Sequence, residues 1–364
     1  MNVHLVYPTD LKRNSSPWSE GNFIYKYFRK THKIYTYNWL SLGSINPEPG
    51  DALIGHAHPN PLTIFRKSMK KKGWSKVILF QPYNEDVHQI GYLKDVLPFC
   101  DCFLALCGNY WFDRIEKSIF SNWKPKMIHL DLGIESTLFP YVKEVFNKKK
   151  NRKFLYIGND YAFNNYAKNF NYLKKIIKNF GKEYFATAGN RKISGVKHYG
   201  WLDILSIEAK SIIKNYDFLI LTSNHDANPA VILEAMSWGL IPIITKQSGY
   251  SEEKNFFYIP LNDTNETLKI LDLAQNISDD KIKEMSLYNL KRVQTYYTPG
   301  KFCDTVGNSL SKNNKNYSIK INTHDNFEIE KKIKISHNYY LKPINIFSLL
   351  KANLSIIFKK IFKC

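Results

Sequence analysis

Short apolar runs alternate with amphipathic stretches along most of this chain of 364 residues. The runs are rich in Leu and Ile and carry little charge, as buried strands of a parallel sheet do. In the first part of the chain the pattern predicts strands at 2–7, 33–39, 51–57, 76–81, 101–107 and 127–132, and helical stretches near 20–30, 60–71, 88–98 and 109–120. This alternation predicts a doubly wound parallel α/β sheet.

A polar, basic segment at 143–153 interrupts the alternation, and we interpret it as a linker. After it, apolar runs at 154–158, 184–189 and 198–201 predict a second sheet, with a long helix from about residue 168. The chain is long enough for two domains with full cores. We therefore predict a Rossmann-like domain at 1–142, the linker at 143–153, a second Rossmann-like domain at 154–310 and a basic tail at 311–364.

The clearest unit of the pattern is a helix between two apolar runs, 217–223 and 240–245. Asn228 is a good N-cap, Pro229 suits the first helical position, and Gly239 follows the last turn. The loop before this helix lies at the carboxyl end of a strand. Open α/β sheets bind their ligands there.

The start of this helix suits an anion. Residues 229–232 present free N–H groups and the positive end of the helix dipole, which favour a phosphate. Asp226 precedes the helix and Glu234 lies about one and a half turns into it. Carboxylates accept hydrogen bonds from sugar hydroxyls, and a nucleotide sugar supplies a ribose and a hexose beside its diphosphate. The alternative is that both acids are solvated residues at a helix start, where acids are common.

Asp226, seven residues, Glu234 and then Ala-Met-Ser-Trp-Gly-Leu-Ile-Pro resemble the acidic-x7-Glu signature of the retaining GT-B glycosyltransferases of the group 1, or family 4, type. The resemblance implies two Rossmann-like domains that face each other across a cleft, the first for the acceptor and the second for the nucleotide sugar, with a C-terminal helical tail. It implies that Asp226 contacts the donor sugar and that Glu234 contacts the ribose. The first acid is usually Glu in that family, and Pro229 stands where a small residue is usual.

The resemblance also assigns residues that hold the diphosphate. In the family a Gly, here Gly158, is followed by an Arg and later by a Lys. Asn159 replaces the Arg, while Lys168 fits the Lys. The predicted catalytic residues are therefore Asp226 and Lys168. Loss of the guanidinium removes a bidentate clamp, so a weakly active or inactive homologue that binds sugar or nucleotide is an alternative.

Further candidates complete the predicted site. The donor-binding candidates besides Glu234 and Gly158 are Asn228, Ala230, Val231, Ile232, Tyr199, Gly200 and Gly21. Tyr199 and Gly200 match the place where the family frames the nucleotide base, and Gly21 matches a loop that approaches the diphosphate.

The acceptor and cleft candidates are His58, Gln81 and Asn84. Gln81 stands where the family often has a His that contacts the donor sugar, and Gln cannot transfer protons at neutral pH. His56 and His58 share a strand face, but no third ligand with readable spacing is nearby. We therefore favour packed or loop histidines, or a cleft role for His58, over a metal site.

The implied reaction is transfer with retention at the anomeric carbon, from a nucleotide sugar to a polysaccharide or lipid-linked acceptor. The helix start and Lys168 would stabilise charge on the departing diphosphate. No Asp-x-Asp occurs in the sequence, so we expect neither a divalent cation nor another cofactor. We expect the enzyme to be of the hexosyltransferase type.

The formal net charge of +20 suggests anionic partners such as nucleotides, nucleic acid or an acidic membrane face. Almost all the cations are Lys, while nucleic-acid readers favour Arg for base edges, so a nucleic-acid-binding protein is disfavoured. The five Cys residues and the lack of a signal segment predict a cytoplasmic protein with reduced thiols. A basic amphipathic pattern at 346–364 predicts a helix that lies on the inner face of an anionic membrane or packs on the first domain.

Overall fold

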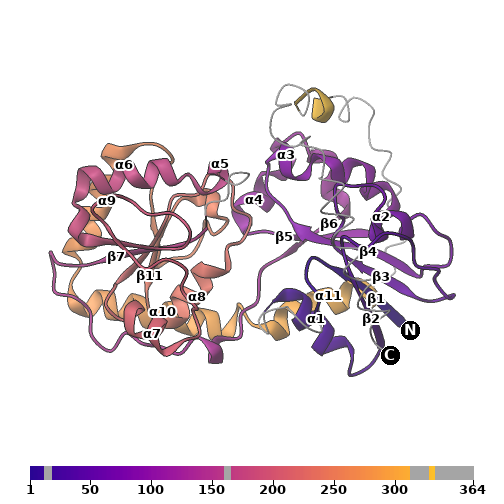
Figure 1. The fold of residues 1–364 in the computed structure, drawn as a ribbon, viewed down its shortest axis with the longest axis horizontal. Coiled ribbons are helices and arrows are strands. Elements are labelled where there is room, and N and C mark those ends of the chain that lie inside the picture. Colours follow the sequence, from indigo (N-terminus) through magenta and orange to yellow (C-terminus); the bar gives the residue numbers. More distant parts are fainter. Residues whose placement is uncertain (12–18, 160–164, 312–327, 333–364) are drawn as a thin grey trace. The chain divides into compact units, whose positions relative to one another are not determined.

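The computed structural model describes residues 1–11, 19–159, 165–311 and 328–332. These residues form two compact units, each built on one parallel sheet (Figure 1). The first unit takes Met1–Leu106, Phe112–Leu130 and the described residues from Phe302 onward, and the second takes Cys107–Trp111 and Asp131–Lys301. The prediction of two Rossmann-like α/β domains with parallel sheets is confirmed.

The first sheet has six strands in the order β2-β1-β3-β4-β5-β6, and all neighbouring pairs are parallel. The strands are β1 Asn2–Tyr7, β2 Lys33–Asn38, β3 Ala52–Gly55, β4 Lys76–Pro82, β5 Cys102–Leu106 and β6 Met127–Leu130. Every residue of β3 and β5 is buried, as expected for inner strands covered on both faces. Each strand overlaps the range that the hydrophobic pattern predicts.

The labelled α-helices near this sheet are α1 Glu20–Phe28, α2 Ile64–Ser68, α3 Val87–Ile90, α4 Asn109–Arg114 and α11 Pro299–Ser311. Residues 328–332 are also helical, and α4 begins in the second unit and ends in the first. Helices α1 and α11 cover the same face (Figure 1), because Phe302 of α11 packs against Phe23 of α1 and Phe80 of β4 at ring-centroid distances of 6.3 and 5.9 Å. Helix α11, which follows the second Rossmann-like pattern along the chain, thus ends in the first unit.

Two helices of the first unit give way to 3-10 turns earlier than the sequence predicts. The stretches expected near 88–98 and 109–120 pass from α-helix into 3-10 turns at Gly91–Asp95 and Ile115–Lys117. Gly and Pro are the least favourable residues inside a helix, and the first stretch contains both Gly91 and Pro98. An amphipathic spacing alone did not reveal these interruptions.

The second sheet also has six parallel strands, in the order β12-β11-β10-β7-β8-β9. The strands are β7 Phe154–Ile157, β8 Phe185–Ala188, β9 Lys197–His198, β10 Phe218–Leu221, β11 Ile241–Ile244 and β12 Phe257–Tyr258. Its helices are α5 Asn165–Lys168, α6 Phe170–Phe180, α7 Ile207–Ile213, α8 Ala230–Trp238, α9 Thr264–Asn276 and α10 Asp279–Thr295. Figure 1 shows α6 and α9 over one face of this sheet and α7, α8 and α10 over the other.

Helix α8 is the element that orients the predicted site. It is buried along almost its whole length, and Gly239 ends it with a positive φ of 95°, which glycine adopts without strain. Pro229 is the N-cap and Asn228 does not cap the helix, which corrects the prediction. Instead, the Asn228 side-chain oxygen accepts hydrogen bonds from the Leu132 N–H at 3.2 Å and the Tyr250 hydroxyl at 2.8 Å.

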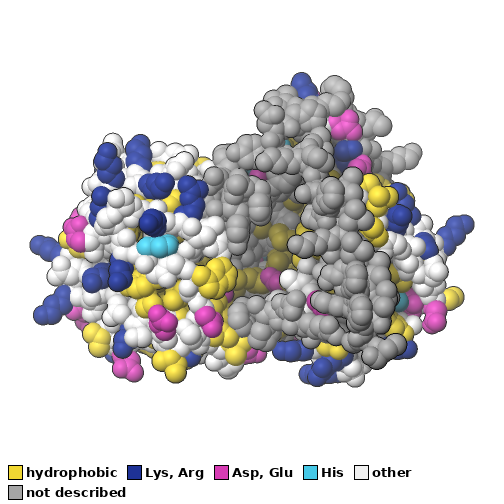
Figure 2. Space-filling view, in the orientation of Figure 1, with side chains coloured by type: hydrophobic (Ala, Val, Ile, Leu, Met, Phe, Trp, Pro, Cys, Tyr) yellow, Lys and Arg dark blue, Asp and Glu magenta, His cyan; other side chains and the backbone are white. Residues whose placement is uncertain are grey.

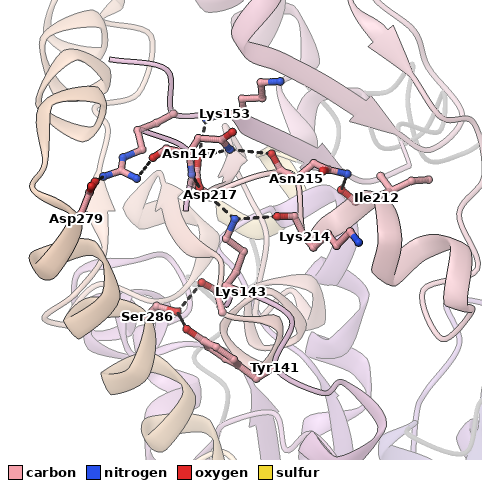
Figure 3. Close-up of polar contacts among 12 residues, drawn as sticks. Tyr141, Lys143, Asn147, Lys153, Ile212, Lys214, Asn215, Asp217, Asp279 and Ser286 are labelled. Atoms are coloured by element: carbon pink, nitrogen blue, oxygen red, sulfur yellow. Dashed lines mark hydrogen bonds and ion pairs between the residues drawn. The ribbon is translucent and has the colours of Figure 1, made fainter. Parts of the chain in front are cut away.

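The segment expected to be a linker at 143–153 is part of the second unit (Figure 3). The Asp217 carboxylate accepts hydrogen bonds from the Lys143 ammonium at 3.2 Å, the Asn147 N–H at 2.9 Å, the Asn147 side-chain amide at 2.8 Å and the Lys153 N–H at 2.9 Å. The Lys143 and Asp217 side chains are both fully buried. The polar composition of this segment therefore reflects a buried ion-pair network. The long segment of the second unit begins at Asp131, before the predicted linker.

Positive charge is spread over the surface of the second unit. Figure 2 shows many Lys and Arg side chains on the side where Figure 1 labels α6, and Lys175 and Lys178 of that helix are exposed. Among the described residues, no helix has the length and hydropathy needed to cross a bilayer. The amphipathic helix predicted at 346–364 lies outside the described residues.

Candidate active site

Three loops meet at the carboxyl ends of β10, β7 and β8, which are neighbours in the second sheet. The Gly158 N–H, after β7, donates to the Ala188 carbonyl at 3.0 Å, and the Gly189 N–H, after β8, donates to the Gly200 carbonyl at 2.7 Å. A Cβ atom on Gly189 would lie 1.9 Å from the Gly158 carbonyl oxygen, so only glycine allows this approach. The structure therefore brings the predicted residues Gly158 and Gly200 to one edge of the sheet.

The two predicted catalytic residues contact each other. Lys168, the last residue of α5, forms an ion pair with the Asp226 carboxylate, and the Ser223 hydroxyl lies 3.3 Å from the same carboxylate oxygen. The Lys168 and Asp226 side chains are 21% and 16% exposed, so solvent or a ligand can reach the pair. The Asn224 N–H donates to the Ala167 carbonyl at 2.8 Å, which holds the loop after β10 against α5.

Glu234 is a buried acid in α8. Its residue is 6% exposed, and no described residue makes a hydrogen bond or an ion pair with its carboxyl group. Burial raises the pKa of Glu234 to about 8, because removal from water disfavours the charged form. At neutral pH the side chain is mostly a neutral carboxylic acid, which can both donate and accept hydrogen bonds.

The start of α8 presents hydrogen-bond donors. In the described chain the N–H groups of Ala230 and Val231 have no hydrogen-bond partner, and the buried side-chain nitrogen of Asn228 has none either. The Ile232 N–H donates to the Pro229 carbonyl at 3.2 Å, so Ile232 is not the free donor that the sequence predicted. Three donors and the positive end of a nine-residue helix remain for an anion.

Tyr199 has a local role in the structure. Its hydroxyl lies 2.8 Å from the Tyr216 hydroxyl, and the two rings meet edge to face at 6.3 Å. Gly200 beside it has a positive φ of 66°, and a Cβ atom there would meet nothing within 4 Å. The backbone of this loop is therefore accessible, while the Tyr199 ring packs within the unit.

The cleft candidates of the first unit lie at the carboxyl ends of β3 and β4. The Gln81 amide is used within the protein: its oxygen accepts from the Ala57 N–H at 3.2 Å and its nitrogen donates to the Tyr92 hydroxyl. His58 accepts a hydrogen bond from the Asn60 N–H at Nδ1, 3.1 Å away, so a neutral His58 carries its proton on Nε2. Burial, with a smaller effect of the Arg66 charge, lowers the pKa of His58 to about 4.

The other two candidates of the first unit are also packed. Asn84 is buried, and its oxygen accepts from the Asp86 N–H at 2.8 Å. Gly21 lies in the first turn of α1, where a Cβ atom would come within 2.7 Å of the Tyr7 ring. Glycine at 21 thus lets α1 pack on the end of β1, and its contact with a diphosphate stays a prediction.

The sequence did not reveal one segment of this site, Cys107–Trp111. The Gly108 N–H donates to the Ala227 carbonyl at 2.8 Å, and a Cβ atom on Gly108 would lie 2.0 Å from the Gly249 carbonyl oxygen. A glycine directly after a buried strand is a signal that a backbone approaches closely. The partner of that approach, however, is more than a hundred residues away.

Comparison with solved structures shows what this pair of units resembles. A glycosyltransferase from Rickettsia africae superposes with a TM-score of 0.61 and 11% identity, over 87% of this chain and 99% of that one. The galactosyltransferase WaaB of the lipopolysaccharide outer core superposes with a TM-score of 0.56 and 13% identity, over 85% and 99%. This chain has the GT-B fold.

The GT-B likeness extends to larger proteins. TarM superposes with a TM-score of 0.54 and 12% identity over 80% of this chain, which spans 58% of the length of TarM. No protein-family model and no curated protein sequence matches this chain. The likeness therefore concerns the fold, and the chemistry must be argued from the site.

Proposed function

We propose that this protein is a retaining glycosyltransferase that moves a sugar from a nucleotide-sugar donor to a polysaccharide or lipid-linked acceptor. The observation that carries the proposal is the start of α8, where three donors without a partner among the described residues lie in one short segment between Asp226 and Glu234. A diphosphate matches the donors, and the sugar and ribose hydroxyls match the two acids. Among proteins of similar fold, Anabaena HepE has been solved with UDP and glucose.

In the proposed donor complex the diphosphate accepts hydrogen bonds from the N–H groups of Ala230 and Val231 and from the Asn228 amide. Glu234 contacts the ribose hydroxyls, which would satisfy a buried carboxyl group that has no partner in the described chain. The backbones of Gly158 and Gly200 would line the nucleotide. Each contact uses a group that lies at the carboxyl edge of the second sheet.

The proposed reaction breaks the bond between the anomeric carbon and the diphosphate and forms a bond from that carbon to an acceptor hydroxyl. The acceptor proton passes to the departing phosphate, and no protein nucleophile takes part. Charge that grows on the diphosphate is stabilised by the start of α8 and by Lys168. Lys168 would then leave Asp226, whose carboxylate becomes available to a hydroxyl of the donor sugar.

The proposal includes no divalent cation, because the sequence has no Asp-x-Asp. For the acceptor we propose the first unit, with His58 as a neutral imidazole that offers an Nε2 proton and Asn84 as a further polar side chain. The Gln81 amide supports the backbone at Ala57 and would act through that loop.

A panel of nucleotides and nucleotide sugars tests the proposal by thermal shift and calorimetry. A donor present at a hundred times its Kd stabilises the protein by about 2.7 kcal/mol. Glu234→Ala should weaken nucleotide binding strongly. If the affinity of this variant for every nucleotide sugar that binds the wild type is unchanged, the assignment of the donor site is wrong.

Asn159 favours a second candidate, a homologue that binds the donor but transfers little or nothing. It stands where an Arg would clamp the diphosphate in the family, and its side-chain oxygen is buried without a hydrogen-bond partner in the described chain. Binding of a nucleotide sugar without hydrolysis or transfer would establish this candidate. Asn159→Arg should then raise activity.

For localisation we propose a cytoplasmic protein that attaches to the inner membrane face through 346–364. A basic amphipathic segment can lie on anionic lipid. Sedimentation with vesicles that contain phosphatidylglycerol tests this, with a chain truncated at 340 as the comparison. Equal binding by both chains would contradict the proposal.

A further inference from the structure

The segment Cys107–Trp111 separates two portions of the first unit along the chain, yet it belongs to the second unit. Besides the Gly108 contact with Ala227, the Tyr110 N–H donates to the Gly249 carbonyl at 3.1 Å and the Asn109 oxygen accepts from the Ser251 N–H at 3.1 Å. The segment is thus hydrogen-bonded to the loop before α8 and to the turn after β11. We call it the strap.

Trp111 is the residue of the strap that contacts the backbone of Asp226. It is 2% exposed, and its indole N–H donates to the Asp226 carbonyl at 3.0 Å and to the Gln247 carbonyl at 3.2 Å. The Asp226 N–H donates to the same Gln247 carbonyl at 3.0 Å. The N–H and the carbonyl of Asp226 therefore both have hydrogen-bond partners. The Trp111 indole links the chain at Asp226 to the chain at Gln247.

The indole also packs on the neighbouring side chain. Its ring is stacked on His225 with a centroid distance of 5.4 Å and an interplanar angle of 22°. The ring and the N–H therefore restrain residues 225 and 226 together. The indole contacts Asp226 through its backbone carbonyl alone, and the Asp226 carboxylate remains with Lys168 and Ser223.

We propose that Trp111 is a positioning residue for Asp226 and so sets how tightly the protein holds the sugar part of its donor. The inference rests on the proposed function and assigns to the strap a role in that same site. When Lys168 turns to the diphosphate, the Asp226 carboxylate loses its ion-pair partner. The backbone contacts from Trp111 and Gln247 do not depend on the ligand, so they keep the carboxylate in place at that moment.

This role separates sugar recognition from nucleotide recognition. Among the described residues, no hydrogen bond or ring contact joins Trp111 to the donors at the start of α8 or to the Glu234 carboxyl group, so nucleotide binding should survive a change at Trp111. A displacement of about 1 Å at a reacting group can cost about a hundredfold in rate. If Trp111 had only a structural role, its change would not lower the affinity for the sugar part of the donor alone.

The test measures the affinity of each nucleoside diphosphate and its sugar by calorimetry, for UDP and UDP-glucose, GDP and GDP-mannose, ADP and ADP-glucose, and dTDP and dTDP-glucose. The pair that the wild type binds most tightly is then used with Trp111→Phe, which keeps an aromatic ring and removes the N–H. We expect the Kd of the nucleotide sugar to rise about tenfold and the rate of its hydrolysis to fall, while the Kd of the nucleoside diphosphate changes less than twofold.

A second variant separates loss of the N–H from loss of ring volume. Site-specific incorporation of 3-benzothienylalanine at 111 keeps the shape of the indole and replaces its N–H with sulfur, and it should reproduce the Phe result. Trp123→Phe is the matched control, because Trp123 is fully buried and its N–H has no hydrogen-bond partner in the described chain. It should leave both affinities unchanged.

Equal losses of nucleotide and nucleotide-sugar affinity, or equal losses in Trp111→Phe and Trp123→Phe, would overturn the inference and leave the proposed function standing. An unchanged ratio of the two affinities in both Trp111 variants would do the same. A wild-type protein that binds none of the four pairs would overturn the proposed function itself, and the inference with it.

Discussion

Two polar clusters lie at opposite ends of β10, and their hydrogen bonds differ. At the amino end, the buried Asp217 carboxylate receives hydrogen bonds from Lys143, Asn147 and Lys153. At the carboxyl end, the Asn228 side-chain nitrogen and the N–H groups of Ala230 and Val231 have no partner in the described chain. Burial is the only influence on the pKa of the Glu234 carboxyl group there. Buried polar groups normally have hydrogen-bond partners, so the carboxyl end of β10 is the end that fits a ligand.

The two clusters show that burial and charge alone do not identify a functional site. The Asp217 cluster holds the segment after Asp131 onto the second unit, and a ligand would find no free group in it. The candidate site at α8 carries buried groups that have no hydrogen-bond partners among the described residues.

Asp217→Asn should be the most damaging single change to stability. It removes the negative charge beside the fully buried Lys143 ammonium, and breaking a buried ion pair costs about 3–5 kcal/mol. Urea denaturation measures the free energy of unfolding. Glu284→Gln is the matched control, because its partner Lys281 is 50% exposed and Glu284 is 65% exposed; such pairs contribute about 0.2–1 kcal/mol. Similar losses in both variants would show that the Asp217 network does not hold the unit together.

Lys168→Ala should lower the rate of transfer by about a hundredfold to a thousandfold, the usual effect of removing one group that stabilises transition-state charge. The free energy of unfolding should change much less, because the pair with Asp226 is partly exposed. Single-turnover kinetics with a saturating donor measures the rate. Lys175→Ala, an exposed lysine on α6, should be silent, and an equal loss in that variant would point to a general charge effect.

Glu234→Gln should change how stability depends on pH. Folding raises the pKa of Glu234 to about 8, so the folded state holds a proton that the unfolded state loses above about pH 4.3. The stability from this proton is fully present below about pH 4.3, is lost progressively as pH rises from there to about 8, and changes little above that. Between pH 7 and 8 the wild type should lose about 1 kcal/mol from this group, and the variant should not. Parallel stability curves for the two proteins would mean that Glu234 titrates normally.

Gly200→Ala should have the smallest effect. The positive φ of 66° costs a residue with a Cβ atom about 1 kcal/mol, but nothing lies within 4 Å of the added atom. The melting temperature should fall by a few degrees, and nucleotide affinity should fall only if the base approaches this backbone. Gly189→Ala offers the contrast, because its Cβ would clash with the Gly158 carbonyl; equal effects of the two changes would contradict the described geometry.

Much of the fold and part of the site were predictable from local patterns. Parallel strands appear as apolar runs, and the end of α8 follows from Gly239. The resemblance assigned Lys168 to the diphosphate and Asp226 to the donor sugar, and the structure shows that the two side chains form an ion pair. Their roles in catalysis stay predictions, as do those of His58, Asn84 and Gly21.

The errors have a common physical origin. Asn228 has the composition of an N-cap, but its oxygen is taken by Leu132 and Tyr250. The polar residues at 143–153 have the composition of a linker, but a buried carboxylate on a distant strand binds them. Local propensity describes what a residue can do, and long-range partners decide which of those options it takes.

Neighbouring residues were enough to predict two parallel α/β sheets and a loop–helix unit with an acid on each side of its proposed anion site, because hydrophobic period and helix boundaries depend on local sequence. Only the tertiary structure decided which polar groups are satisfied and which remain open, and it alone placed Trp111 against Asp226, 115 residues away in the sequence. Hydrogen bonds over such separations form only once the sheets have packed. The residues that prepare this site are therefore visible only in the folded chain.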